Sequence, residues 1–256
     1  MTYRPLAAAP EADVEVPEPV AEYAAGRGAD GERLVPVWLN QLGGLTFRLR
    51  LPSGGVEYAK WSPASAGVDL EDEAQRLAWA APFTPVPRPL HSARHDDGAQ
   101  LLVTAAVPGE AAVLPRWIAR PDQAARAIGA GLRVLHDALP VEDCPFDWSL
   151  ASRLTDAKDP ARGRELAGAA PGVDRLVVCH GDACAPNTLI GADGSWSAHV
   201  DLGALGIADF WADLSIAAWS TVWNYGPGFE GLVYAGYGVE PDAERIAFYR
   251  EVWDAT

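Results

Sequence analysis

The pattern of apolar and polar residues differs between the first and second parts of the chain. Between Val35 and Lys60, short apolar stretches alternate with polar positions and are separated by glycine pairs, as in LTFRLRL at 45–51 and VEYAK at 56–60. Strand-length alternation broken by glycine turns is typical of antiparallel β-strands. We therefore expect residues 35–60 to form an antiparallel meander.

After the meander, the spacing of apolar residues changes from that of strands to that of helices, with one further buried strand. Residues 70–81 have an acidic first turn after Asp69 and repeat apolar side chains on one helical face, which predicts a helix. The run at 101–107 is a buried strand that ends at a Pro-Gly pair, and residues 123–139 carry the apolar stripe of a core helix. Beyond these, short apolar strands precede two further helices, which are predicted at 209–223 and 241–253.

A strand-rich first part followed by a helix-rich second part predicts an α+β protein with two lobes. Residues 1–34 are expected to be an N-terminal arm, poorly ordered at 1–16, with a short helix at 18–25. Residues 35–104 would form a small antiparallel-sheet N-lobe with one helix. Residues 105–256 would form a larger, mainly helical C-lobe.

Composition narrows the classes of partner. The chain has 256 residues and a formal net charge of -15, which disfavours nucleic acid as a partner because that binding needs Lys and Arg. An acidic surface suits a cationic small molecule, although much of the charge also serves solubility. Three cysteines form no even disulfide framework, and no stretch has the ~18 apolar residues of a membrane span. These features predict a cytoplasmic protein without a membrane partner.

Chemistry concentrates between His180 and Asp213. Asp182 heads the sequence HGDACAPN, Asn187 ends it, and Asp201 follows a short hairpin-like stretch. Phosphoryl transfer needs a carboxylate to accept the proton of the attacking hydroxyl, and oxygen ligands for a magnesium ion on the phosphates. Asp182 suits the first role, and Asn187 with Asp201 suits the second. We expect His180 to orient the loop by hydrogen bonds, and Asp209 and Asp213 to be structural.

A lysine that contacts phosphate, held by a glutamate, is the other requirement of this chemistry. The chain has only two lysines among its twenty basic residues, Lys60 and Lys158. Lys60 ends a predicted strand, and Glu73 lies thirteen residues later in the predicted helix. Glu71 and Asp72 are its acidic neighbours, so a solvated helix start is the alternative reading of this acidic group.

These motifs resemble those of the aminoglycoside phosphotransferases. HGDACAPN is similar to the catalytic loop of that family, HGDxxxxN, and DLGALGIADFWADL to its metal-binding segment and the following helix. VEYAKWSP with LEDEAQRL resembles the lysine strand and its glutamate helix. CPFD at 144–147 and RIAFYR at 245–250 resemble landmarks of the 3'-phosphotransferase branch. The resemblance covers residues 35–256.

The resemblance implies a protein-kinase-like fold, with a nucleotide-binding N-lobe and a catalytic, acceptor-binding C-lobe. It implies ATP or GTP as phosphoryl donor, Mg²⁺ as cofactor, and a cationic small molecule as acceptor. Asp182 becomes the catalytic base, with Asn187 and Asp201 as metal ligands. Nucleotide contacts are carried over to Lys60, Glu73, Gly43, Gly44 and the backbone of Thr104 and Ala106.

The acceptor half departs from the family pattern. Few acids lie between Trp148 and Leu176, and the residue after DLG, usually an arginine, is Ala204. Tryptophans stand where acids are expected, and they would serve either as core or as a sugar-stacking surface. Candidate acceptor contacts are Asp147, Trp219, Trp223, Trp253, Asp254 and Thr256.

Three functions follow from these residues. The first is phosphorylation of an aminoglycoside antibiotic, most readily at its 3'-hydroxyl, which gives resistance. The second is phosphorylation of another hydroxylated metabolite or antibiotic by an enzyme of the same fold. The third is a pseudokinase-like module that binds nucleotide without turnover, and the complete set of Lys60, Asp182, Asn187 and Asp201 argues against it.

Overall fold

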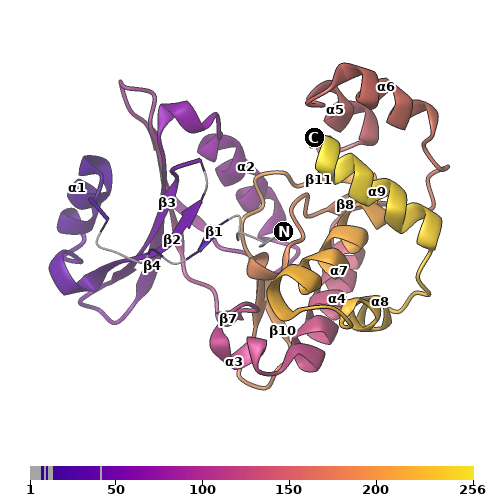
Figure 1. Ribbon diagram of the computed structural model, residues 1–256. Coiled ribbons are helices and arrows are strands. Elements are labelled where there is room, and N and C mark those ends of the chain that lie inside the picture. The colour runs from indigo at the N-terminus through magenta and orange to yellow at the C-terminus, as the bar shows by residue number, and fades with distance from the viewer. Residues whose placement is uncertain (1–6, 9, 11–13, 41) are drawn as a thin grey trace. The chain divides into compact units, whose positions relative to one another are not determined.

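The computed structural model describes residues 7–8, 10, 14–40 and 42–256. The predicted N-terminal arm at 1–16 therefore lies largely outside the described residues. The chain divides into two compact units (Figure 1). Unit 1 comprises the described residues up to 81 together with 87–107, and unit 2 comprises 82–86 and 108–256.

Unit 1 is built on a six-stranded antiparallel sheet. Its strands, in spatial order, are β1 (Ala7–Ala8), β2 (Leu34–Asn40), β3 (Leu45–Arg50), β4 (Val56–Ser62), β6 (Gln100–Ala105) and β5 (Pro89–Arg94). Short 3₁₀ turns lie at Gly31–Arg33 and Ala64–Ala66. The predicted meander is the central part of this sheet. Strand β5 was not predicted, because its first residue is a proline and the preceding segment is rich in prolines. At a sheet edge, a proline removes no ladder hydrogen bond that the sheet needs.

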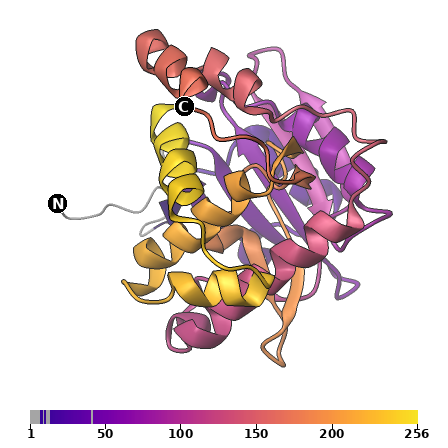
Figure 2. The ribbon, with the colours of Figure 1, turned by 90° about the vertical axis from the view of Figure 1, so that its right-hand side faces the viewer.

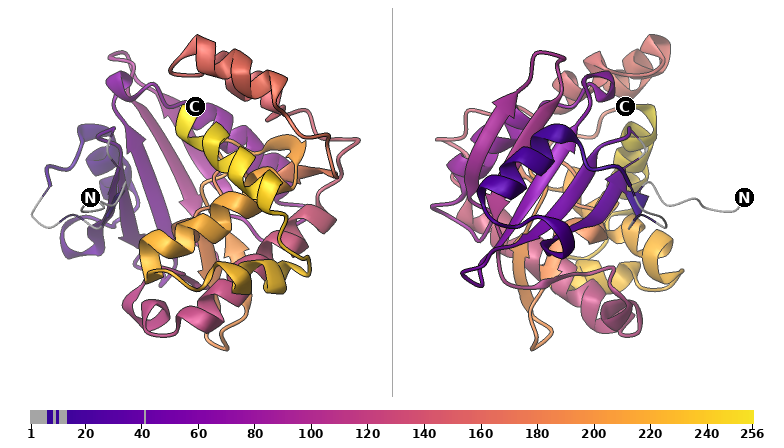
Figure 3. Two further views of the ribbon diagram at one scale, coloured as in Figure 1. Left: turned by 45° about the vertical axis from the view of Figure 1, so that its right-hand side comes forward. Right: turned by 90° about the vertical axis from the view of Figure 1, so that its left-hand side faces the viewer.

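Helix α1 (Glu18–Gly26) packs on one face of this sheet (Figure 3, right). Val20, Ala24 and Ala29 are completely buried against inward-facing strand residues such as Phe47 and Ala59. Burial of apolar area contributes about 25 cal/mol per Å² to stability, so this contact stabilises the helix on the sheet. Residues 18–29, which were expected to belong to the N-terminal arm, thus share the sheet's core.

Helix α2 (Leu70–Ala80) packs against strands β5 and β6. It begins where predicted, because the Asp69 side chain accepts hydrogen bonds from the N–H groups of Glu71 and Asp72. Leu70 and Leu77 are buried, whereas Glu71 and Asp72 are exposed.

Unit 2 is mainly helical. Its helices are α3 (Pro115–Ile118), α4 (Pro121–Ala138), α5 (Leu150–Thr155), α6 (Pro160–Gly168), α7 (Trp211–Tyr225), α8 (Glu230–Tyr237) and α9 (Ala243–Ala255). Its strands are β7 (Glu110–Ala111), β8 (Leu176–Cys179), β9 (Thr188–Ile190), β10 (Trp196–His199) and β11 (Gly206–Asp209). They form a three-stranded sheet in the order β10-β9-β7 and the pair β11-β8. Helix α9 lies beside α7, and α8 packs against α4 (Figure 2).

The helix α8 was not predicted. It contacts α4 through glycines, since a Cβ at Gly129 would lie 2.0 Å from the Val233 oxygen and one at Gly236 would lie 2.4 Å from the Arg126 oxygen. Glycine lowers helix propensity by about 1 kcal/mol relative to alanine, so the residues that permit this contact weaken the sequence signal. Among the described residues, no helix is both long and apolar enough to cross a membrane.

Candidate active site

Lys60 and Glu73 meet in unit 1. Lys60 lies in strand β4, and its Nζ donates to Oε2 of Glu73 in α2 at 2.7 Å. The Glu73 side chain is 6% exposed, whereas the neighbouring acids Glu71 and Asp72 face solvent. The acidic start of α2 therefore directs one of its three acids inward, and that acid is the one expected to pair with Lys60.

The glycine pair after β2 forms a tight turn. Gly43 has a φ of 83°, in the left-handed region that favours glycine. The Asn40 side-chain oxygen accepts hydrogen bonds from the N–H groups of Leu42 and Gly44. A Cβ at Gly44 would lie 2.7 Å from Nδ2 of Asn40. The turn itself favours glycine at position 43 through its positive φ, and a side chain at position 44 would displace the Asn40 amide that caps the turn. The contact of both glycines with a triphosphate stays a prediction.

The end of β6 is occupied by sheet hydrogen bonds. Thr104 pairs with Tyr58 of β4, and the N–H of Ala106 donates to the carbonyl of Val56 at 3.1 Å. Adenine recognition by the Ala106 N–H therefore requires that bond to open.

Asp182 lies in the loop between β8 and β9, residues 180–187, hereafter the HGD loop. Nδ2 of Asn187 donates to both the backbone oxygen and Oδ2 of Asp182, at 2.9 and 3.0 Å. The other carboxylate oxygen, Oδ1, is buried and accepts no hydrogen bond from an N–H or O–H group in the described part of the chain. A hydrogen bond with the nearby Cys184 thiol lowers the pKa of the Asp182 carboxyl, against the larger opposing effect of burial. Gly181 has a φ of 87°, and a Cβ there would lie 2.1 Å from the Ala204 oxygen. The loop therefore fixes one oxygen of Asp182 through the amide of Asn187.

Asp201 lies near this carboxylate in an unusual backbone conformation. Its φ is 64°, the one positive φ outside glycine in the described residues. Aspartate tolerates this left-handed region better than most residues other than glycine, and non-glycine residues in it concentrate at functional sites. Burial and the negative charge of Asp201 raise the pKa of Asp182. Two carboxylates that repel each other in a buried place are suited to a cation.

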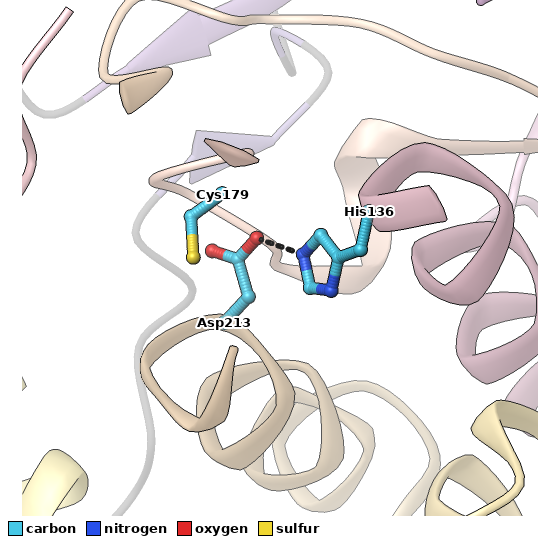
Figure 4. A group of neighbouring side chains, drawn as sticks. All are labelled: His136, Cys179 and Asp213. Carbon is cyan, nitrogen blue, oxygen red and sulfur yellow. Dashed lines mark hydrogen bonds and ion pairs between the residues drawn. The ribbon is translucent and has the colours of Figure 1, made fainter. Parts of the chain in front are cut away.

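Asp213 in α7 holds the HGD loop by hydrogen bonds to its backbone. It accepts hydrogen bonds from the N–H groups of His180, at 2.5 Å, and Gly181, at 3.0 Å, and its Oδ2 lies 3.0 Å from Nε2 of His136 (Figure 4). Burial alone would raise the pKa of Asp213, but the hydrogen bonds that it accepts from the His136 ring and the His180 N–H hold it below its usual value. The structural role expected for Asp213 is the arrangement found.

His180 also orients the loop. Its Nδ1 accepts from the N–H of Asp182 at 3.2 Å, and its Nε2 lies 3.0 Å from the Val200 carbonyl, so the proton is assigned to Nε2. Asp209 binds the N–H groups of Trp211 and Asp174 and pairs with Arg245 of α9 at 3.3 Å. Both residues thus have structural contacts, as expected.

His136, Cys179 and Asp213 offer donor atoms that all lie within 4.8 Å of one another (Figure 4). Each is committed to a protein contact, since Asp213 binds the loop amides and the Cys179 thiol donates to the Asp209 carbonyl at 3.6 Å. Burial raises the pKa of Cys179 well above its usual value, which keeps it a thiol. A metal ligand would have to be a thiolate. We assign this cluster to support of the loop.

The candidate acceptor residues have separate partners. Trp219 and Trp223 contact each other with ring centroids 5.0 Å apart, and the Arg250 guanidinium lies 5.3 Å from the Trp219 ring. Asp147 accepts from the N–H and hydroxyl of Ser149 at the start of α5.

The other candidates lie near the end of α9. Asp254 is exposed, and its carbonyl accepts from Nζ of Lys158 at 3.2 Å. Oγ1 of Thr256 accepts from Arg153 at 3.5 Å, and Trp253 is half-buried. Contact of these residues with an acceptor stays a prediction.

Arg153, His136 and Tyr237 form buried contacts that no sequence motif indicates. Arg153 is buried against the Trp148 ring at 4.2 Å, and burial lowers its pKa to about 10. His136 and Tyr237 form a buried hydrogen bond of 2.9 Å across 101 residues of sequence. Neither histidine nor tyrosine lies in a recognisable motif, so only the three-dimensional structure reveals their contact.

Comparison with known proteins gives the family of the chain. The sequence matches the phosphotransferase enzyme family over residues 26–249. It is 36% identical to an aminoglycoside 3'-phosphotransferase of Streptomyces fradiae over 228 residues, 76% of this chain and 82% of the relative. It is 34% identical to the streptomycin 3''-kinase of Streptomyces griseus over 258 residues, 87% and 91% of the two chains.

Solved structures show the same similarity. An aminoglycoside 3'-phosphotransferase of type VIII matches with a TM-score of 0.74 and 30% identity, over 92% of this chain and 99% of that one. An aminoglycoside phosphotransferase of Streptomyces rimosus, in complex with ADP and streptomycin, matches with a TM-score of 0.67 and 28% identity, over 94% and 99%. The protein-kinase-like fold expected from the sequence is confirmed. The chain belongs to the phosphotransferase enzyme family, with aminoglycoside 3'-phosphotransferases among its relatives.

Proposed function

We propose that this enzyme transfers the γ-phosphoryl group of ATP or GTP to the 3'-hydroxyl of an aminoglycoside and thereby gives resistance to it. The observation that carries the proposal is the carboxylate of Asp182. One of its oxygens is held by Asn187, and the other is buried and accepts no hydrogen bond from an N–H or O–H group of the described residues. A buried acceptor that the protein leaves unsatisfied is unusual and needs an explanation.

Asp182 acts as the base in this proposal. Its Oδ1 accepts the hydrogen of the attacking hydroxyl, and its raised pKa brings it closer to the pH at which it must take up a proton. Asn187 and the loop amides held by Asp213 keep the carboxylate in place. Orientation of the nucleophile supplies much of the rate in phosphoryl transfer, because the reaction requires little covalent chemistry from the protein.

Mg²⁺ fits the residues beside Asp182. Nδ2 of Asn187 is used by Asp182, so the amide oxygen of Asn187 is directed elsewhere and can bind a cation. Asp201 adds a carboxylate whose charge already perturbs Asp182. One amide oxygen and one carboxylate are a suitable protein contribution to a magnesium ion that keeps phosphate and water ligands. When bound, the ion would neutralise charge on the phosphates.

Lys60 contacts the phosphates of the nucleotide in this proposal, and Glu73 orients it. The support is the 2.7 Å ion pair with a largely buried glutamate, which limits the positions that the flexible lysine side chain can adopt. Gly43 and Gly44 would lie over the triphosphate, and Thr104 and Ala106 would meet the adenine through their backbone.

The aminoglycoside acceptor is proposed on the relatives' activities and on the net charge of -15. One observation favours the second candidate, a less cationic hydroxylated acceptor. Arg250 lies over Trp219, so a cation already occupies one face of an aromatic ring that an ammonium group would otherwise use.

A coupled ADP-release assay over a panel of acceptors tests the proposal. Kanamycin should be turned over, whereas tobramycin, which lacks the 3'-hydroxyl, should not. Phosphorus NMR of the product should place the phosphate at the 3' position. Turnover of both compounds would assign another hydroxyl, and turnover of neither, with activity on a neutral or singly charged acceptor, would favour the second candidate. Asp182→Asn is the inactive control in every case.

A further inference from the structure

A continuous chain of hydrogen bonds connects the surface of unit 2 to the HGD loop. Asp137, at the exposed end of α4, accepts from Arg175 at 3.3 Å, and Nη2 of Arg175 donates to the Tyr237 hydroxyl at 2.5 Å. The same hydroxyl lies 2.9 Å from Nδ1 of His136, whose Nε2 lies 3.0 Å from Asp213. Asp213 then holds the amides of His180 and Gly181 directly before Asp182.

With a neutral His136, all donors and acceptors of this chain are satisfied. A guanidinium only donates, so the Tyr237 oxygen accepts from Arg175, and because the Asp213 carboxylate takes the Nε2–H of His136, the Tyr237 hydrogen goes to Nδ1. Nδ1 is then without a proton, and the neutral imidazole carries its proton on Nε2, where it donates to Oδ2 of Asp213. Burial raises the pKa of Tyr237, which keeps this hydroxyl protonated and able to donate.

Local packing brings the tyrosine to this place. Tyr237 is stacked on Phe210 with ring centroids 5.4 Å apart, and Arg175 lies 5.2 Å from the Phe210 ring. The glycine contacts of α8 with α4 bring the helix of Tyr237 close to the helix of His136. Loss of the hydroxyl alone would keep the stacking and remove both hydrogen bonds.

We propose that Tyr237 and Arg175 are positioning residues for phosphoryl transfer. They hold His136 in the Nε2-protonated tautomer that donates to Asp213, and so fix the backbone that presents Asp182. The inference rests on the proposed role of Asp182, and its test has a readout that needs neither that role nor an acceptor.

The tautomer is measured by long-range ¹H–¹⁵N NMR of the histidine rings in the whole protein. We expect wild-type His136 to be neutral with its proton on Nε2, and Tyr237→Phe to lose this single form. Tyr234→Phe is the matched control, because it removes a hydroxyl from the same helix outside the chain of hydrogen bonds. A wild-type His136 that is doubly protonated, or protonated on Nδ1, would overturn the proposal.

Turnover supplies the second readout, with Mg-ATP hydrolysis in water and, where one is identified, the acceptor. Tyr237→Phe should lower kcat about three- to tenfold, the effect of roughly one hydrogen bond, and leave the nucleotide KM within about twofold. Arg175→Met should lower kcat in the same way, and the double variant should lose no more than Tyr237→Phe alone. The proposal would be contradicted by an equal loss of kcat in Tyr234→Phe or by additive losses of kcat in the double variant. A change in nucleotide KM without a change in kcat would also contradict it.

Discussion

Each unit holds a pair of charged side chains, and the two pairs interact in opposite ways: the charges attract each other in unit 1 and repel each other in unit 2. In unit 1, Lys60 and Glu73 attract each other at 2.7 Å. In unit 2, Asp182 and Asp201 repel each other, and with burial this repulsion raises the pKa of Asp182. The first pair is favourable in the folded protein without a ligand. The second pair is unfavourable until a bound cation neutralises its charge.

The two pairs therefore prepare the protein for a ligand in different ways. An ion pair between a half-buried lysine and a buried glutamate restricts a flexible side chain, and loss of either partner harms the folded protein. A pair of like charges costs stability until it is neutralised. Substitutions in the two units should therefore have opposite effects on stability, although each should harm activity.

Asp182→Asn should give the largest effect. The amide still accepts from Asn187 but cannot take up the proton of the hydroxyl, so kcat should fall on the order of 10²–10⁴-fold. Nucleotide affinity, measured by titration calorimetry, should change less than about twofold. A variant that keeps more than about a tenth of the wild-type kcat would exclude Asp182 as the base.

Asp201→Asn should weaken apparent Mg²⁺ affinity by roughly 10–100-fold. Asparagine tolerates the left-handed backbone of this position, so the change removes charge with little added strain. A magnesium titration of the ATPase rate measures the effect, and kcat should fall with it. An unchanged magnesium midpoint would remove Asp201 from the metal site.

Lys60→Ala should raise the nucleotide KM about tenfold or more, since hydrogen bonds to charged groups contribute about 1.5–3 kcal/mol. It should also lower Tm, because Glu73 stays buried without its cation. Lys158→Ala is the control, since that lysine contacts the carbonyl of Asp254 at the surface. Equal effects of the two substitutions on nucleotide KM would contradict the role of Lys60.

The smallest effect should be a gain in stability. Because folding raises the pKa of Asp182, the native state binds its proton more tightly, and the free energy of unfolding decreases as pH rises through that pKa. With magnesium removed by EDTA, Asp182→Asn should therefore have a higher Tm than wild type at neutral pH. The difference should vanish below about pH 3, where the aspartate is protonated in both states. A lower Tm for the variant at neutral pH would show that repulsion is not the dominant effect.

The sequence indicated the contacts of the candidate site residues better than those of their surroundings. Lys60, Glu73, Asp182 and Asn187 could be found because their residue types and spacing follow from the chemistry, and the structure gives the first two a shared ion pair and the last two a shared hydrogen bond. Tyr237 could not be found in this way. Its helix has a weak pattern because glycines allow it to approach α4, and its partner His136 is distant in sequence.

Strand β5 was missed for a related reason. Propensity describes a residue alone, and Pro89 disfavours a strand unless the strand lies at an edge, where β5 is found. Which strand takes the edge depends on the pairing of the whole sheet. Strand pairing between residues that are distant in sequence therefore determines parts of the fold that the local pattern of residues does not predict.

The left-handed backbone at Asp201 also limits which residues can evolve there. Glycine, asparagine and aspartate adopt this conformation at small cost, whereas most other residues do not. A library randomised at position 201 and sorted for folded protein should return mainly these three residues. The same library selected for growth on an antibiotic substrate should return aspartate alone, so the two selections would separate the demand of the chain's geometry from the demand of its chemistry.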